Sequence, residues 1–188
     1  MASPQITEIL LLAREGDRQA KDQIARWLAD TIRRELRRLK WNMPRDQHDA
    51  TDIVSEVFLK LLRSNCLDFA PNRRYLAVAA ARAVREVLVD EARKQTRKKR
   101  GAGLQRLPFE FILDALDEQG VKLIPLNDAL IELSEKYPRQ AEVVELRFFG
   151  GNTHKEIAEI LGVGISTVES EWRSARGWLY RTLAEEMA

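Results

Sequence analysis

The sequence is poor in the residues from which many catalytic and metal sites are built. Its 188 residues include one cysteine, Cys66, and two histidines, His48 and His154. A single cysteine excludes both an intrachain disulfide framework and a cysteine-rich zinc site. His48 and Asp52 have the i, i+4 spacing of a ligand pair on a helix, but no third ligand has an obvious place. No Gly-rich phosphate loop is found either. We therefore expect no metal site, no cofactor and no enzymatic activity.

The chain also lacks a large net charge and long apolar runs. A net charge of +2 is too small for a protein that coats nucleic acid, so any DNA affinity must come from local patches or from a partner. No apolar run is long enough to span a bilayer. The N-terminus lacks the basic, apolar and small-residue order of a secretory signal. These absences predict a cytoplasmic protein without membrane insertion.

Helical periodicity recurs along the chain outside the mixed segment 104–126, and no segment alternates convincingly as a strand would. The stretch from Arg18 to Trp41, for example, has neither glycine nor proline, and its apolar residues keep helical spacing. The fold class is therefore predicted to be all-α. The expected helices cover residues 6–13, 18–41, 49–63, 73–95, 127–136, 139–149, 153–161 and 166–183.

The sharpest change in composition is a basic run that ends in Gly101 and Gly103. We predict a domain boundary there, with helical domains at residues 1–96 and 127–188 joined by a flexible basic linker at 97–126. The run could be a solvated linker or a phosphate-binding tail, and the sequence leaves both open. Its members are Arg93, Lys94, Arg97, Lys98, Lys99 and Arg100.

The segment from residue 145 to residue 179 reads as two short helices joined by a tight turn. Thr153 and Glu156 form a capping box that begins the first helix, and Gly162 is placed to end it in a left-handed conformation. Ser166 and Glu169 suggest a second capping box. This layout is typical of a helix-turn-helix whose second helix enters a DNA major groove. A helical hairpin within a bundle, without nucleic acid, is the alternative.

The second helix of this pair has a core face and a candidate DNA face. Val168, Trp172, Ala175 and Leu179 recur at helical spacing and should be buried. Residues in the first turns of a recognition helix usually meet base edges, whereas arginines further along more plausibly reach phosphates. The candidate DNA-binding residues are Ser166, Thr167, Ser170, Glu171, Arg173, Ser174 and Arg176.

Three stretches, in order, resemble a bacterial RNA polymerase sigma factor of the extracytoplasmic-function (ECF) type. GDRQAKDQIARWLADTIRREL followed by HDATDIVSEVFLKLL resembles the opening of sigma domain two. YLAVAAARAVREVLVDEARKQTRKKR resembles the next helix, and residues 145–179 resemble sigma domain four. The run RSARGWLY is also similar to a subgroup common in planctomycetes and their relatives.

The resemblance implies a factor that binds core RNA polymerase and directs promoter-specific initiation of transcription. Domain two would dock on the polymerase clamp and handle the minus-ten element. Domain four would dock on the flap and read the minus-thirty-five element. The implied polymerase-binding residues are Asp49, Asp52, Ser55 and Glu56. The implied DNA-binding residues of domain two and the linker are Asn72, Arg73, Arg74, Arg82, Lys94, Arg97 and Lys98.

Other partners and functions remain open at this point. The family pattern admits an anti-sigma protein as a further partner, and the free chain is expected to be a monomer. Glu169 and Glu171 stand where basic residues are common in the family, which reduces attraction for phosphate. A stand-alone helix-turn-helix regulator would bind its operator without polymerase. A pure interaction protein would bind polymerase or a regulator without any promoter preference.

Overall fold

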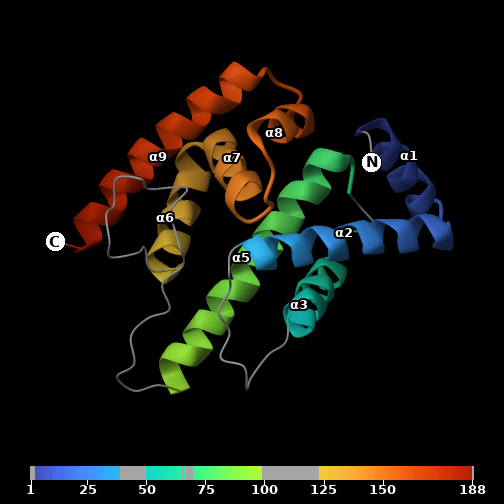
Figure 1. Ribbon diagram of the computed structural model, residues 1–188, viewed down its shortest axis with the longest axis horizontal. Helices are drawn as coiled ribbons and strands as arrows, with labels where there is room; N and C mark the ends of the chain where they lie inside the picture. Colours follow the sequence, from blue (N-terminus) through green and yellow to red (C-terminus); the bar gives the residue numbers. More distant parts are fainter. Residues whose placement is uncertain (1–2, 39–49, 65, 67–69, 99–122, 188) are drawn as a thin grey trace.

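The computed structural model describes residues 3–38, 50–64, 66, 70–98 and 123–187, and these residues form helices and short turns (Figure 1). The all-α prediction is confirmed, because no strand occurs in these ranges. The N-terminal half contains α1 (Ser3–Arg14), α2 (Arg18–Arg38), α3 (Ala50–Arg63) and α5 (Arg73–Lys98). The C-terminal half contains α6 (Leu123–Lys136), α7 (Pro138–Phe148), α8 (His154–Leu161) and α9 (Ile165–Met187).

Side-chain caps fix where the helices of the N-terminal half begin. Gly16, with φ of 96°, ends the turn after α1 in a left-handed conformation. Asp17 then caps α2, since its Oδ1 accepts a hydrogen bond from the backbone N–H of Ala20 at 2.9 Å. Asn72 caps α5 in the same way, accepting from the N–H of Tyr75 at 2.9 Å. The starts of both long helices are therefore encoded locally.

Two large apolar residues of the N-terminal half, Leu62 and Tyr75, are half exposed although their helical spacing favours burial. Leu62 is 53% exposed and Tyr75 is 49% exposed. Leu62 lies in the last turn of α3 and Tyr75 in the first turn of α5. Periodicity assigns a residue to a helix face, but neighbouring helices do not cover that face as far as its terminal turn. Positions away from the ends of the same helices, including Val57 of α3 and Leu88 of α5, are fully buried.

The C-terminal half has its own apolar core, and its first helix begins earlier than predicted. Leu126, Leu130 and Leu133 of α6 are buried, as are Leu146 of α7 and Ile157 of α8. The helix α6 starts within the segment 97–126 that the sequence assigned to the linker. The helix α5 also continues into that segment, to its second residue. The described ends of the linker are thus helical.

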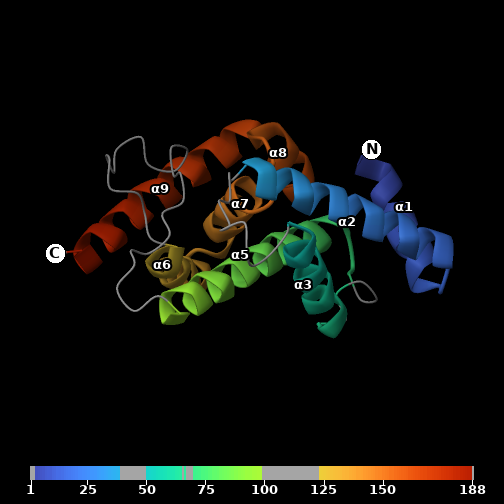
Figure 2. The same cartoon turned by 60° about the horizontal axis from the view of Figure 1, so that its bottom comes forward.

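The two halves pack against each other along α5. This helix contacts α3 on the N-terminal side and α6, α7 and α8 on the C-terminal side. Figure 2 shows α5 running beneath α7, with α6 beside its C-terminal part. The helix α7 in turn contacts α9, so a single helix layer separates α5 from α9. Among the described helices, none has the length and apolar character that a membrane span requires.

Candidate nucleic-acid interface

The helices α8 and α9 are joined by a tight turn whose geometry follows the sequence pattern. At the start of α8, the Thr153 side chain accepts a hydrogen bond from the Glu156 N–H at 3.2 Å, and Glu156 accepts from the Thr153 N–H at 2.7 Å. This is the predicted capping box. Gly162 ends α8 with φ of 68°, the left-handed conformation expected there. Val163 follows and packs, partly buried, against the core.

The capping box should contribute measurably to stability. Thr153→Ala removes the acceptor for the Glu156 N–H and is expected to lower the free energy of unfolding by about 1 kcal/mol. Thr153→Ser keeps a hydroxyl oxygen in place and serves as the matched control. Urea denaturation followed by circular dichroism measures both. Equal losses in the two variants would show that the hydrogen bond does not stabilise the helix.

The start of α9 differs from the prediction. The helix begins at Ile165, and the carbonyl oxygen of Gly164 accepts from the N–H groups of Thr167 at 3.1 Å and Val168 at 3.2 Å. Gly164 is therefore the N-cap residue, and the predicted Ser166–Glu169 capping box is wrong. Ser166 lies inside the first turn and is exposed. Its hydroxyl and the Glu169 carboxylate are consequently not committed to the roles predicted for them.

The helix α9 carries stripes of side chains at i, i+4, i+7 and i+11 spacing. Val168, Trp172, Ala175 and Leu179 form the predicted core stripe, and all four are buried. Every candidate DNA-binding residue of α9 lies outside this stripe. A second stripe, which faces α6 and α7, contains Thr167, Glu171, Ser174 and Trp178. A third, on the opposite flank, contains Glu169, Arg173, Arg176 and Tyr180. The ridge between them presents Ser166, Ser170 and Gly177, and Arg173 lies on the border between this ridge and the third stripe.

Glu171 is tied to the neighbouring helix α7. Its Oε1 accepts a hydrogen bond from Nε of Arg139 at 2.8 Å and lies 2.6 Å from Nη2 in an ion pair, and its side chain is only 16% exposed. Further along the same flank, Nζ of Lys136 lies 5.9 Å from the ring centre of Trp178. Arg139 therefore holds the Glu171 carboxylate through one of its two oxygens.

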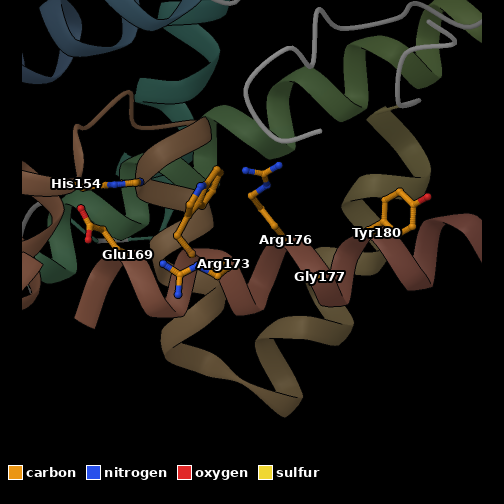
Figure 3. Close-up of a pocket in the computed structure, with 7 residues that line it drawn as sticks. His154, Glu169, Arg173, Arg176, Gly177 and Tyr180 are labelled. Carbon is orange, nitrogen blue, oxygen red and sulfur yellow. The ribbon is translucent and has the colours of Figure 1, made fainter. Parts of the chain in front are cut away.

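The opposite flank of α9 borders a depression of about 550 Å³ (Figure 3). Arg173 and Arg176 line it together with Glu169, Tyr180 and His154 from the start of α8. The His154 ring lies 6.0 Å from the Trp172 ring, centre to centre. Desolvation, followed by the positive charge of Arg147, lowers the pKa of His154, and Glu169 opposes this. A neutral imidazole beside two arginines makes this flank a mixed aromatic and cationic surface.

Sequence reasoning did not place Glu169, His154 or Tyr180 beside the arginines of this depression. Glu169 had been assigned to a cap, His154 had been given no role in a site, and Tyr180 had been noted only as the end of the run RSARGWLY. Glu169 and Tyr180 could have been predicted, because they share a helical stripe with Arg173 and Arg176. His154 comes from another helix, so no spacing rule could have found it.

The candidate polymerase-binding residues lie on or before α3. Asp49 lies outside the described residues. Asp52 and Ser55 are exposed, and Glu56 is partly exposed. A carboxylate oxygen of Glu56 lies 3.6 Å from Nζ of Lys94 on α5. Lys94, a candidate DNA-binding residue, also pairs with Glu91 at 3.5 Å.

The other candidates of the N-terminal half lie on or next to α5. Asn72, Arg74 and Arg82 border a depression of about 610 Å³ that also reaches Cys66 and, across from them, Glu142 of α7. Burial raises the pKa of the Cys66 thiol. Arg73 is partly buried next to this group. Arg97 and Lys98 belong to the last turn of α5, but their side chains lie outside the described residues, and so do Lys99 and Arg100 of the basic run.

Comparison with known proteins shows to which family the chain belongs. The family model described as "ECF sigma factor" matches residues 3–185, nearly the whole chain. The chain belongs to the ECF sigma factor family. ECF RNA polymerase sigma factor SigK from Mycobacterium ulcerans (strain Agy99) is 24% identical over 137 residues, which cover 70% of each protein. No solved structure matches the chain significantly.

Family membership confirms the interpretation that the sequence motifs suggested. The chain is a sigma factor that directs the initiation of transcription, and its partners are RNA polymerase and promoter DNA. The alternative of a stand-alone helix-turn-helix regulator is not supported. Within the described ranges, no cluster of three or more His, Cys, Asp or Glu residues could hold a metal ion. His48, one of the two residues of the rejected metal pair, lies outside those ranges.

Proposed function

We propose that this ECF sigma factor contacts polymerase and promoter through two separate modules. The N-terminal half acts as sigma domain two, docking on the polymerase clamp through α3 and engaging the minus-ten element through α5. The C-terminal half acts as sigma domain four, docking on the polymerase flap and placing α9 in the major groove of the minus-thirty-five element. The factor works in the cytoplasm as a monomer before it binds polymerase, and it catalyses no reaction itself.

The observation that carries this proposal is the polar ridge of α9 next to a well-formed turn. Ser166 and Ser170 are exposed in the first turns of the helix, and Arg173 follows them on the same ridge. Hydroxyl groups can donate to or accept from base edges, while arginines suit phosphates. A buried stripe anchors the helix to the core, so this ridge is held outward. A groove-binding helix requires these features.

Transcription in vitro is the decisive test. Core polymerase is combined with this protein and a fragmented genomic library, and the transcription starts that depend on the protein are mapped. We expect starts preceded by a common pair of upstream elements. Binding to polymerase without any dependent start would favour an interaction protein instead. Loss of promoter dependence on adding a candidate anti-sigma protein would identify that further partner.

The acidic side of α3 should matter for polymerase binding. Asp52→Lys with Glu56→Lys reverses two charges on this helix and is expected to weaken binding to core polymerase about tenfold, because complementary charges become like charges. Co-purification and a titration with labelled protein measure the effect. Glu8→Lys with Glu15→Lys, exposed positions in and after α1, is the matched control. Equal binding by both double variants would exclude this face of α3.

The basic end of α5 should govern the salt dependence of promoter binding. If Lys94, Arg97 and Lys98 contact phosphates, replacing all three with glutamine should flatten the log–log dependence of holoenzyme binding on salt. Each lost contact reduces the slope by about one. Neutralising Arg18, Lys21 and Arg26, exposed on α2, provides the control. An unchanged slope in the first variant would favour the solvated-linker interpretation.

A further inference from the structure

Two groups of ion pairs join α3 to α5. Nζ of Lys60 on α3 lies 2.8 Å from Glu86 and 3.6 Å from Asp90 of α5. One turn closer to the start of α3, Oε1 of Glu56 lies 3.6 Å from Nζ of Lys94. The partners on α5 shift toward its C-terminus as the residues on α3 shift toward its N-terminus, so the two helices are antiparallel. The first turns of α3 therefore lie along the last turns of α5.

This arrangement brings the two candidate interfaces of the N-terminal half together. The first turns of α3 contain acidic residues assigned to polymerase, and the last turns of α5 contain basic residues assigned to DNA. Glu56 belongs to the first group and Lys94 to the second, and the two residues pair with each other. Their side chains are 44% and 45% exposed, so an external partner can reach each of them. One ion pair is thus shared between a polymerase-binding candidate and a DNA-binding candidate.

Glu91 is a second acidic partner of Lys94, and it lies on the same helix. Its Oε2 is 3.5 Å from Nζ of Lys94, and its side chain is only 5% exposed. A buried carboxylate at i, i+3 spacing stays beside Lys94 whatever binds to the surface of α3. Lysine has a flexible stem and a rotatable ammonium group, so it can exchange one outer partner for another while the helix stays in place. Glu91 is therefore the fixed partner of Lys94, and Glu56 is the exchangeable one.

The Glu56 carboxylate and a DNA phosphate compete for the same ammonium group. Both are oxygen anions that accept hydrogen bonds from Lys94. In the same way, a basic group of the polymerase competes with Lys94 for Glu56. Whichever partner binds first breaks the pair, so the second partner meets a residue that is already released. The two binding events should therefore favour each other.

We propose that Lys94 couples polymerase docking to promoter binding, because it gives up Glu56 to a basic group of the clamp and donates instead to a phosphate of the minus-ten element. The proposal rests on the assignment of α3 to the clamp and of α5 to that element. Cooperativity arises here from the exchange of one ion pair within the N-terminal half. The coupling is also reciprocal, so DNA strengthens polymerase binding by the same factor as polymerase strengthens DNA binding.

Lys94→Gln gives the sharpest test, because the loss of a DNA-binding cation should tighten polymerase binding. Without the ammonium group, Glu56 loses its competitor within the chain. Titration of labelled full-length protein with core polymerase, in the absence of DNA, should give a dissociation constant about threefold lower than that of the wild type, as expected for a half-exposed pair. A pair with only a structural role would leave this affinity unchanged or reduce it. Either result would overturn the proposal.

Lys60→Gln is the matched control, since it removes the other lysine that joins α3 to α5. Its partners Glu86 and Asp90 both lie on α5, so the variant leaves the Glu56 pair intact. Its affinity for core polymerase should equal that of the wild type. If Lys60→Gln tightened binding as much as Lys94→Gln, the effect would come from net charge, and the proposal would be wrong.

A double-mutant cycle then measures the coupling itself. The affinity for core polymerase is measured with and without a saturating single-stranded oligonucleotide that carries the minus-ten element of a mapped promoter. The gain in affinity caused by the oligonucleotide should be about threefold smaller than in the wild type for Glu56→Gln and for Lys94→Gln. The double variant should show the same reduction rather than one of about ninefold, because both substitutions remove one and the same pair. Reductions that multiply would refute coupling through this pair.

The outcomes separate this proposal from the function on which it rests. If the protein supports promoter-dependent transcription but every variant keeps the wild-type gain, the proposed function stands and the coupling is refuted. If Glu56→Gln and Lys94→Gln change neither polymerase binding nor oligonucleotide binding, the assignment of both residues is wrong, and the coupling fails with it. Equal reductions in the two single variants and the double variant, with tighter polymerase binding by Lys94→Gln, support the proposal.

Discussion

Arg85→Met is expected to lower the free energy of unfolding by about 3 kcal/mol at pH 8, and by much less at pH 5. Arg85 is the buried partner of Glu145, and one oxygen of that carboxylate, Oε2, already lacks a hydrogen-bond partner. Removing one member of a buried ion pair leaves the other charge uncompensated, at a cost of about 3–5 kcal/mol. At low pH the carboxyl group can take up a proton instead, which removes most of that cost.

The sign of the pH dependence follows from the environment of Glu145. Burial raises its pKa from 4.5 to about 7, and the opposing charges of Arg85 and Arg82 on α5 only partly offset this. Glu86, also on α5, raises the pKa further, and Asn127 of α6 carries no charge. The folded state therefore holds a proton that the unfolded state releases above pH 4.5. The stability from this proton is fully present below pH 4.5 and is lost as pH rises through 7.

Urea denaturation of the wild type, Arg85→Met and Glu145→Gln between pH 5 and pH 8 measures these effects. The wild type should lose stability relative to Glu145→Gln as pH rises, on the order of 3 kcal/mol over the range. Arg85→Met with Glu145→Leu removes both charges and should recover most of the loss of the single variant. A loss below 1 kcal/mol for Arg85→Met at pH 8 would show that the pair is solvated.

Local signals predicted the parts of this fold that depend on neighbours in sequence. The Thr153 capping box, the left-handed Gly162 and the buried stripe from Val168 to Leu179 all follow from short-range hydrogen bonding and helical spacing. The start of α9 was predicted wrongly because Ser166 and Glu169 match a capping pattern that also fits inside a helix. The backbone carbonyl of Gly164, which no side-chain pattern reveals, begins that helix instead.

Contacts between the halves could not be predicted from the sequence. Helical spacing can indicate whether Arg85 or Glu145 faces the core or the solvent. It cannot indicate that these two residues, which belong to different helices, contact each other. Within the C-terminal half, nothing local pairs Glu171 with Arg139 either, because these residues are 32 positions apart. Motifs of the family made α3, α5 and α9 the candidate functional helices. They did not indicate which functional side chains would be occupied by partners within the chain.

The helix α9 should show two distinct phenotypes in promoter binding. Glu171 lies in the first turns, where a carboxylate can accept a hydrogen bond from a cytosine amino group. Arg173 and Arg176 lie further along, around the depression with Tyr180, and are suited to phosphates. Base contacts distinguish sequences, whereas phosphate contacts support all of them equally. The two kinds of contact are therefore separable by measuring preference and affinity independently.

Glu171→Ala is expected to relax preference at one base pair of the minus-thirty-five element by roughly 1–3 kcal/mol. Arg173→Ala and Arg176→Ala should each weaken holoenzyme binding about equally across a panel of single-base promoter variants, and reduce the salt slope by about one. Arg139→Ala is the matched control for Glu171, because it removes the competing partner and leaves the carboxylate in place. It should preserve or sharpen the base preference. If Glu171→Ala tightened promoter binding uniformly, with no change in base preference, Glu171 would be only a repulsive charge near the phosphates. Ser166 and Ser170 would then be the remaining base-reading candidates of the ridge.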